Sequence, residues 1–401
     1  TNAEVAAKCR SQHKSQGFGS APQLGSQVEY LEWINGEKPN NNNPLSGIDT
    51  SWNRIQEGTL INKLTERLLL NFDYQKPYNN VAALIEIYKG LLKVNDTHWR
   101  SIKIKELTSI IQKCLGLRLQ FNSQTPEGVA GNQLNVTIKA INPSSINVNL
   151  EKTSGATEID INTPLESNQS WEKSFMMTLP DKISTPYWLL EKGTLGNYNV
   201  SNDNLKGLPE TPNPIHIEFH LNIDGTNIPF RVPLSYRTTD RVAGEIISDF
   251  QLLPKITCKL SNDIYLFENN NSKKIRVQVQ AHGSLKEGLV QLLVPEGWEV
   301  MPKNHPIAEL KAGATKDFIF DVTPPIGNAT GRFFSTVTEG TSQYQMKLTT
   351  IEYPHISKQY MLTPNESKGV KIDFETKVKN IAYLQGAGDK VAESLRNIGL
   401  K

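Results

Sequence analysis

Cysteine is scarce in this sequence, with three residues, Cys9, Cys114 and Cys258, among 401. They lie far apart, so they form neither a paired metal-binding spacing nor a disulfide framework. No apolar run approaches the ~20 residues that cross a bilayer. The charges nearly cancel, with 43 Lys and Arg against 41 Asp and Glu, so nothing indicates a nucleic-acid or anionic-membrane partner. Composition therefore excludes a zinc finger, a disulfide scaffold and a membrane span.

Familiar catalytic motifs are missing as well. The sequence has no Gly-x-Ser-x-Gly elbow, no phosphate-binding loop, no His-Glu-x-x-His and no Cys-x-x-Cys. It opens Thr1-Asn2-Ala3-Glu4 without a basic-then-apolar signal segment; if the protein is exported, we expect that segment to have been removed. We therefore assign no catalytic residue and no cofactor to this chain.

Three stretches in the first third of the chain repeat apolar residues every three or four positions, which predicts amphipathic helices. They cover residues 60–68, 81–92 and 104–115. Asp96 is the predicted N-cap of the third helix. Short connections favour antiparallel packing as a small bundle. Ahead of them, residues 1–16 predict a short helix and residues 27–34 a strand rich in β-formers.

Near residue 118 the apolar period changes from the helical value to two. A first series alternates at 134–138 and 146–150 around a turn at 142–144, and a hairpin pairs 215–223 with 228–234 around Asp224-Gly225. A second series follows Pro254, at 275–279, 290–294, 318–322 and 344–348. One apolar and one polar face per strand is typical of a sandwich. We predict a mainly β chain with an N-terminal α-helical region, in which a helical spacer precedes two antiparallel, Ig-like β-sandwiches.

The expected organisation has five segments. They are a terminal helix at 1–20, a linker strand and three-helix spacer at 21–118, one sandwich at 119–250, a second at 251–355, and a final segment at 356–401. In the last segment, a strand at 381–384, a Gly386-x-Gly388 turn and a helix at 390–397 are typical of the opening of an α/β domain that is truncated here. The glycine pair favours a plain tight turn over a phosphate site.

Two groups of residues are candidate sites. Tyr187, Trp188 and Tyr198 concentrate aromatic rings in a Gly/Asn-rich segment between strands. Exposed rings stack on sugars, whereas buried ones would cap the sandwich core, and we favour the cap.

His216, Glu218 and His220 alternate on one face of a strand. Their side chains are of the types that hold zinc, so a metal-dependent hydrolase is one hypothesis. Neighbours two apart on a strand are splayed by roughly 6.5–7 Å, which is awkward for one metal. We favour a solvent-facing polar surface.

Several segments resemble one family. The run Lys8-Cys9-Arg10-Ser11-Gln12-His13-Lys14-Ser15-Gln16 resembles the closing helix of PIG-L/LmbE-type deacetylase domains. The rest looks like the long C-terminal extension of multidomain members from Bacteroidetes-like bacteria, in the segments 25–32, 47–52, 186–189 and 387–391. The run Val294-Pro295-Glu296-Gly297-Trp298, with Gly313 and residues 324–327, is similar to the NPCBM-associated-like sandwich found beside glycosidase domains. The C-terminal strand-turn-helix resembles the start of a glutamine-amidotransferase-like domain.

The resemblance implies a zinc-dependent parent enzyme that removes an N-acetyl group from an amino sugar. Such enzymes carry a His-Pro-Asp-Asp loop and a His-x-x-His, and neither occurs here, so no ligand or base is carried over and the zinc would belong to an upstream catalytic domain. The implied role is a non-catalytic accessory region that positions the enzyme or binds glycan. Its implied partners are that upstream domain and a downstream α/β domain, with glycan as a further candidate, in a periplasmic or secreted location. The alternative is a structural or interaction module for domain docking or oligomerisation.

Overall fold

A computed structural model describes residues 1–17, 21–26, 28–39, 43, 45–353, 355–373 and 377–400. The chain separates into two compact units, residues 1–62 and 63–401. Strands hold 39% of the residues and helices 18%, so the chain is mainly β, with its larger helices near the N-terminus. Among the described residues, no helix combines the length and the apolarity needed to cross a bilayer.

The first unit begins with α1 (Asn2–Ser11), as predicted, and a capping box at Thr1 and Glu4 fixes its start. Short 3₁₀ turns follow at Lys14–Gln16 and Trp52–Arg54. The strand predicted at 27–34 is wrong for its described part, 28–34, which pairs with no strand. Val28 and Tyr30 are exposed there. β-propensity alone does not hold a strand that has no neighbour to bury it.

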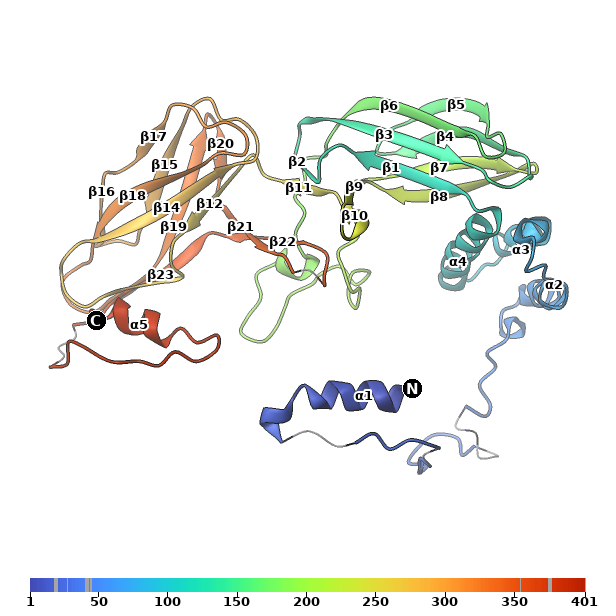
Figure 1. The fold of residues 1–401 in the computed structure, drawn as a ribbon, viewed down its shortest axis with the longest axis horizontal. Helices are drawn as coiled ribbons and strands as arrows, with labels where there is room; N and C mark the ends of the chain where they lie inside the picture. The colour runs from blue at the N-terminus through green and yellow to red at the C-terminus, as the bar shows by residue number, and fades with distance from the viewer. Residues whose placement is uncertain are drawn as a thin grey trace. The chain divides into compact units, whose positions relative to one another are not determined.

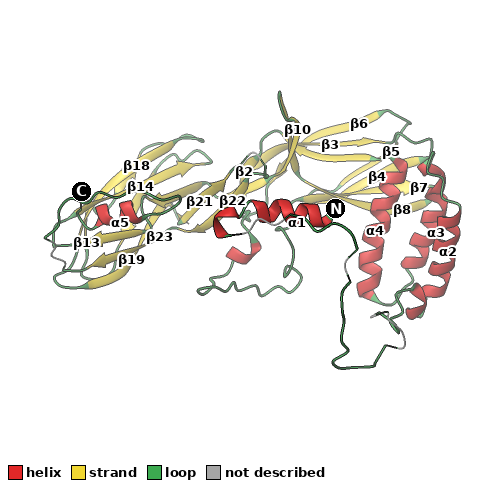
Figure 2. Ribbon diagram, turned by 60° about the horizontal axis from the view of Figure 1, so that its bottom comes forward, coloured by secondary structure: helices red, strands yellow, loops and turns green. Residues whose placement is uncertain are grey.

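The helices match the 3.6-residue spacing. They are α2 (Gly58–Leu70), which runs across the boundary of the units, α3 (Val81–Leu91), preceded by a 3₁₀ turn (Pro77–Asn80), and α4 (Thr97–Leu115). In Figure 2, α3 and α4 lie side by side. The Asp96 carboxylate accepts from the backbone N–H of Trp99 at 3.0 Å, which confirms the predicted N-cap. Gly116, in the left-handed region at φ 68°, ends the helix.

Two sheets build the first sandwich (Figure 1). One has the order β10-β9-β1-β3-β6, with β10 (Gly244–Asp249), β9 (Ser235–Asp240), β1 (Arg118–Ser123), β3 (Gln133–Ile141) and β6 (Ser170–Thr178). The other has the order β5-β4-β7-β8, with β5 (Ile159–Pro164), β4 (Val148–Gly155), β7 (His216–Ile223) and β8 (Thr226–Pro233). β1 contacts β7 and β8 across the layers, and Phe121 and Phe219 are fully buried. This two-layer arrangement fits a β-sandwich.

The predicted hairpin is confirmed. Asp224 and Gly225 both have positive φ, 48° and 80°, and join β7 to β8 with Ile223 paired to Thr226. The turn predicted at 142–144 lies between β3 and β4 as expected, but it links the two sheets, because β3 pairs with β1 and β6 while β4 pairs with β5 and β7.

The second sandwich also has two sheets. One contains β12 (Ile256–Leu260), β14 (Lys273–Ala281), β18 (Thr315–Thr323) and β16 (Glu299–Met301). The other contains β13 (Ile264–Phe267), β23 (Glu366–Lys371), β19 (Ala329–Glu339), β15 (Gly288–Leu293), β17 (His305–Ile307) and β20 (Ser342–Tyr344). Both contribute to one buried core, where the ring of Trp298 meets those of Phe267 and Phe333 edge-on, each at 5.0 Å.

The expected boundary at 355 is wrong. β23 lies beyond it, yet this strand pairs with β19 and β13 inside the second sandwich. A Cβ at Gly369 would lie 2.3 Å from the Phe333 ring, so this strand needs glycine at that position. Strand pairing over such a sequence distance leaves no local signal, so the sequence pattern places the boundary before β23.

The remaining elements are small. β2 (Glu127–Val129) pairs with β11 (Gln251–Leu253), and β21 (Met346–Ile351) with β22 (Gln359–Pro364). The helix expected near the C-terminus is present as α5 (Val391–Asn397), whereas residues 381–384 form no strand. Gly386 and Gly388 belong to a turn that closes on Asp389, whose carboxylate accepts from the Gly386 N–H at 2.6 Å. The predicted strand fails because no described strand pairs with it there.

The three cysteines are free thiols in different surroundings. Cys9 on α1 is exposed, Cys114 on α4 is half-buried and Cys258 on β12 is buried. The Cys258 thiol donates to the carbonyl of Ser335 at 3.4 Å. Burial raises the pKa of both Cys114 and Cys258.

Candidate functional site

A polar hollow of about 430 Å³ lies at one end of the first sandwich, within the usual size range of ligand sites. It opens where β3 passes to β4, where β5 passes to β6 and where β7 turns into β8. Its lining residues are 144–149, 164–167, 222, 224 and 225. We refer to it as the polar hollow.

The buried amide of Asn142 ties two walls of the polar hollow together. Its Nδ2 donates to the carbonyls of Ile146, at 2.8 Å, and Leu165, at 3.4 Å. Its Oδ1 accepts from the N–H of Ser144 at 3.1 Å and from the Ser144 hydroxyl at 2.7 Å. The backbone carbonyl of Asn142 accepts from the N–H of Asn168 at 2.8 Å. One side chain therefore fixes the β3–β4 loop and the β5–β6 loop in a single arrangement.

A β-bulge in β4 organises the third wall. The strand register shifts between Leu150 and Lys152, so Glu151 is the extra residue. The Glu151 carboxylate accepts from the side-chain amides of Asn222, at 2.9 Å, and Asn227. The side-chain oxygen Oδ1 of Asn222 in turn accepts from the N–H of Gly225 at 3.0 Å, which braces the β7–β8 turn.

Five polar side chains line the hollow without a hydrogen bond or ion pair inside the described part of the chain, namely Ser145, Asn147, Asn149, Glu166 and Asp224. Among the described residues that line it there is no Lys, Arg or His and no aromatic ring. The hollow thus offers two carboxylates, two amides and one hydroxyl. It is suited to a ligand with many hydrogen-bond donors and is poorly suited to an anion.

The aromatic residues predicted to contact glycan do not form one platform. Tyr187 is buried, 8% exposed, and its hydroxyl donates to the Leu208 carbonyl at 3.0 Å. Its ring meets the half-buried ring of Trp188 edge-on at 5.0 Å. Tyr198 is 63% exposed and contacts neither ring within the described residues. Burial of Tyr187 is the arrangement that the capping interpretation expects for that residue. Glycan contact by Trp188 and Tyr198 stays a prediction.

The two histidines of the metal hypothesis have separate hydrogen-bond partners. The Arg231 guanidinium donates to Nδ1 of His216 at 3.1 Å, and His220 Nε2 lies 2.8 Å from the Ser154 hydroxyl. Burial and the positive charge of Arg231 lower the pKa of His216. No three His, Cys, Asp or Glu side chains gather as a metal site anywhere in the described residues, Glu218 included. Their positions match the favoured interpretation as the polar face of β7.

Sequence reasoning missed the polar hollow because its walls are distant in the chain. The local signal is the Asn- and Ser-rich run from Asn142 to Asn149, which by itself predicts a turn and the start of a strand. Nothing in that run shows that residues 164–167 and the turn at 224–225 lie beside it.

No protein-family model matches the sequence, and no curated protein matches it. Similar solved structures include a mutant alpha-2-macroglobulin from Salmonella, at 10% identity and a TM-score of 0.22, covering 64% of this chain and 16% of that one. They also include WR4, a C. elegans MSP family member, at 6% identity and a TM-score of 0.18, covering 29% of this chain and 97% of that one. The CARDB domain from Pyrococcus furiosus matches at 10% identity and a TM-score of 0.17, covering 30% and 96%. Such low TM-scores carry no argument about function, and the deacetylase resemblance stays a prediction.

Proposed function

We propose that this chain is a non-catalytic accessory region that holds a PIG-L-type amino-sugar N-deacetylase in position. The observation that carries the proposal is a hydrogen-bonded apolar junction between the sandwiches. A region that positions an enzyme must resist bending between its domains, and a linker without contacts does not.

The junction has a small apolar core. Leu253 of β11 is buried with Tyr360 and Leu362 of β22, and Ile183 packs against them. The buried hydroxyl of Thr185 donates to the Leu362 carbonyl at 3.0 Å and accepts from the Leu362 N–H at 3.3 Å. These contacts join the segment after β6 of the first sandwich to the β21–β22 hairpin, which follows β20 of the second sandwich.

The connecting strand is held on both sides of Pro254. Before it, Leu252 exchanges two hydrogen bonds with Ser184, at 2.8 and 2.9 Å. After it, the Lys255 ammonium donates to both carboxylate oxygens of Glu339, at 2.6 and 2.7 Å, in a partly buried ion pair. Pro254 itself has a fixed φ. These contacts favour a stiff connection over a free linker.

The positioning role is tested by measuring one distance between the sandwiches. Spin labels at Lys173→Cys on β6 and Thr315→Cys on β18, with Cys9 and Cys114 changed to Ser, should give one narrow distance distribution. Thr185→Val removes the bridging hydroxyl at nearly constant shape and should broaden it, whereas Thr238→Val on exposed β9 should not. A broad distribution in the parent protein would contradict the proposal.

The deacetylase assignment has its own test, because a stiff junction would serve other enzymes equally well. Reading the gene on the 5′ side of the Thr1 codon should reveal a His-Pro-Asp-Asp loop and a His-x-x-His. Another kind of coding sequence there would remove the deacetylase from the proposal and leave the positioning role standing.

A second candidate function, an oligomerisation module, is favoured by the β9–β10 hairpin. β9 joins β1 through two residue pairs, Asn122 with Ser235 and Ser123 with Tyr236, and β10 pairs only with β9 among the described strands. Ile246 and Ile247 are exposed on this edge strand. An unpaired strand edge with apolar side chains favours the addition of another strand.

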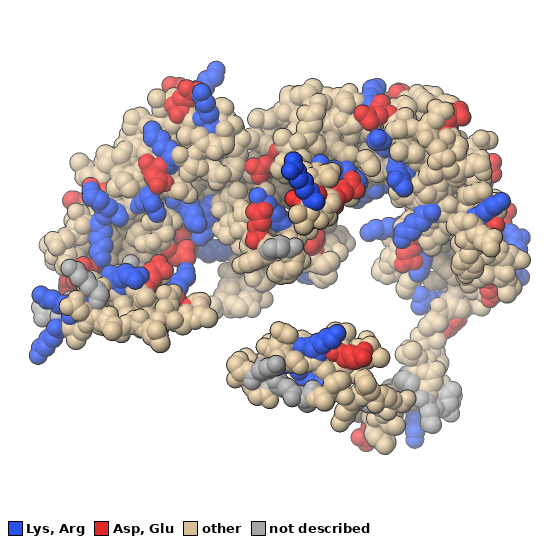
Figure 3. All heavy atoms as spheres, viewed as in Figure 1, with Lys and Arg blue, Asp and Glu red and all other residues tan. Residues whose placement is uncertain are grey.

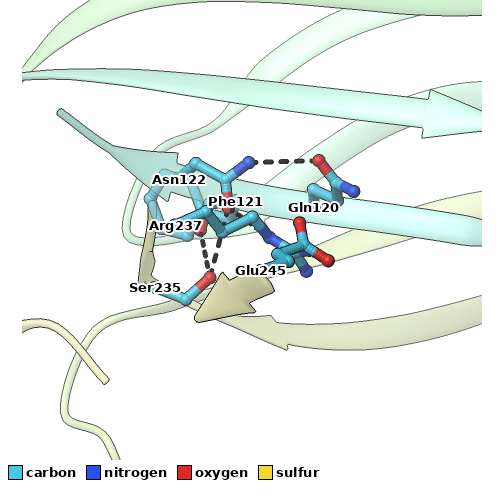
Figure 4. Close-up of polar contacts among 6 residues, drawn as sticks. All are labelled: Gln120, Phe121, Asn122, Ser235, Arg237 and Glu245. Atoms are coloured by element: carbon cyan, nitrogen blue, oxygen red, sulfur yellow. Dashed lines mark hydrogen bonds and ion pairs between the residues drawn. The ribbon is translucent and has the colours of Figure 1, made fainter. Parts of the chain in front are cut away.

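Figure 4 shows the polar contacts that fix the base of this hairpin. Arg237 on β9 donates to Asn122 Oδ1 and to the Glu245 carboxylate, each at 3.2 Å. The Ser235 hydroxyl donates to the same Asn122 oxygen at 3.2 Å. If β10 pairs with a second copy, light scattering should show a concentration-dependent dimer that Ile247→Lys abolishes and Lys173→Glu retains. A monomer at every concentration would count against this role.

A further inference from the structure

We propose that the polar hollow binds a sugar that carries a free, protonated amine. The hollow's preference for a donor-rich, uncharged or cationic ligand follows from its lining alone. The choice of an amino sugar rests on the proposed function, because such a sugar is what remains after an N-acetyl group is removed. No residue of the sequence-based glycan prediction belongs to this site.

The negative charge of the residues that line the polar hollow determines that it favours a positively charged ligand. Glu166 and Asp224 come from different loops and both line the hollow, where no described cationic side chain neutralises them. Glu151, beside the hollow, adds a third carboxylate that is already occupied by Asn222 and Asn227. An ammonium group would form charge-assisted hydrogen bonds with the two lining carboxylates. A phosphate, sulfate or carboxylate ligand would be repelled.

The remaining free groups match sugar hydroxyls. Asn147 and Asn149 each offer an amide that donates and accepts, and Ser145 adds a hydroxyl. A sugar ring carries hydroxyls that do both, so it can satisfy these groups together. The N-acetylated form presents a neutral amide in place of the ammonium and leaves the carboxylates without a cationic partner.

The walls are ordered before any ligand arrives. Asn142 fixes two of the loops through its buried amide, and the Glu151 bulge fixes the third. Asp224 is held at a φ of 48° by the tight turn that it forms with Gly225. Groups that are already in place lose little conformational freedom on binding, which favours affinity.

The hollow lies at the end of the first sandwich that is opposite to the junction. β6 starts beside the hollow at Ser170 and ends at Thr178, shortly before the junction residues Ser184 and Thr185. β7 runs the other way and reaches the hollow at its end. A sugar bound there does not compete with the second sandwich for space.

Calorimetric titration of the full chain with a glucosamine tetramer and with an N-acetylglucosamine tetramer tests the proposal. We expect the amine form to bind about tenfold more tightly, because a charge-assisted hydrogen bond exceeds a neutral one by about that factor. Asp224→Asn removes one charge while Asn tolerates the same positive φ, and it should erase most of the preference. Asn147→Ala should weaken both tetramers.

The matched control is Glu210→Gln, an exposed carboxylate in the segment between β6 and β7. It should leave both affinities unchanged. Circular dichroism and thermal unfolding should show that Asp224→Asn folds like the parent. Equal affinity for the two tetramers, no heat with either, or affinities insensitive to Asp224→Asn and Asn147→Ala would each overturn the proposal.

The sugar-binding experiment and the distance measurement test separate proposals, so one can fail without the other. A narrow inter-sandwich distance with no sugar binding would leave the accessory region standing and remove its sugar site. Amine-selective binding with a broad distance would keep the site and remove the positioning role.

Discussion

At the scale of single residues, Asn142 shows how much one buried amide can organise. It makes four side-chain hydrogen bonds to two loops, and its exposed fraction is 1%. A Ser or Thr at this place would reach fewer of these partners, because a hydroxyl has one donor where the amide has two. The sequence run around it predicts a turn correctly, but it does not reveal that the turn is bonded to Leu165.

Asn142→Ala should destabilise the chain by about 2–4 kcal/mol, because the carbonyls of half-buried Ile146 and buried Leu165 lose their donor. Urea unfolding followed by circular dichroism measures this change. Asn147→Ala, on the exposed side of the same loop, should change stability by at most ~0.5 kcal/mol. Equal effects of the two substitutions would show that the Asn142 network contributes little.

His282 predicts a pH dependence of stability. Burial lowers the pKa of its imidazole, against a smaller opposing effect from the Glu127 carboxylate. Nε2 lies 3.0 Å from the Thr257 hydroxyl. Because the folded-state pKa is below the unfolded one, the unfolded chain binds a proton first as the pH falls. The contribution of His282 to the free energy of unfolding is therefore fully present above the unfolded-state pKa of about 6.5. It declines as the pH drops through that pKa toward the folded-state pKa.

We test this by urea unfolding at about pH 7.5 and at about pH 5. The parent protein should lose more stability over this interval than His282→Gln, in which the group cannot titrate. Parallel losses in the two proteins would assign the pH dependence to other groups.

At the scale of elements, the local sequence pattern predicts those helices and turns that depend on interactions between residues close together in the chain. The helical spacing and the Asp96 cap gave α3 and α4, and Asp224-Gly225 gave the β7–β8 hairpin. The predictions are wrong where strand formation depends on a pairing partner. Residues 28–34 and 381–384 form no strand. β23 belongs to a sheet whose other strands are far away in sequence. Composition of a segment does not show which partner it meets.

The cap of α4 gives a prediction at this scale. Asp96→Ala should lower the free energy of unfolding by about 1 kcal/mol, since the N–H of Trp99 loses its acceptor. Asp96→Asn, which keeps a capping oxygen, should lose much less. Thermal unfolding followed at the helical signal measures both, and a loss that is equal for both variants would argue that the charge and not the hydrogen bond matters.

At the scale of the whole molecule, no single sequence segment could predict the polar hollow or the junction. The hollow needs residues 144–149, 164–167 and 222–225 together, and the junction joins Thr185 to Leu362. On the face seen in Figure 3, basic and acidic side chains are interspersed, in agreement with a formal net charge of +2. This face therefore offers no broad field of one sign, so recognition on it would depend on local sites.

The junction also predicts how the sandwiches unfold. Because they share the core of Leu253, Tyr360 and Leu362, they should melt in one calorimetric transition. Leu362→Ala, at a fully buried position, should cost about 2–5 kcal/mol and separate the melting of the two sandwiches. Leu289→Ala, at an exposed position of β15, is the control. Two transitions in the parent protein would show that the junction does not couple them.

The three cysteines have a use beyond their scarcity. A thiol reacts with alkylating reagents as the thiolate, so burial and a raised pKa both slow it. Cys9 is exposed, Cys114 is half-buried with a raised pKa, and Cys258 is buried with a raised pKa. Mass spectrometry of a timed alkylation therefore reports the opening around Cys114 on α4 and around Cys258 in the second sandwich separately, with the exposed Cys9 as the reference for an accessible thiol, and it needs no engineered label.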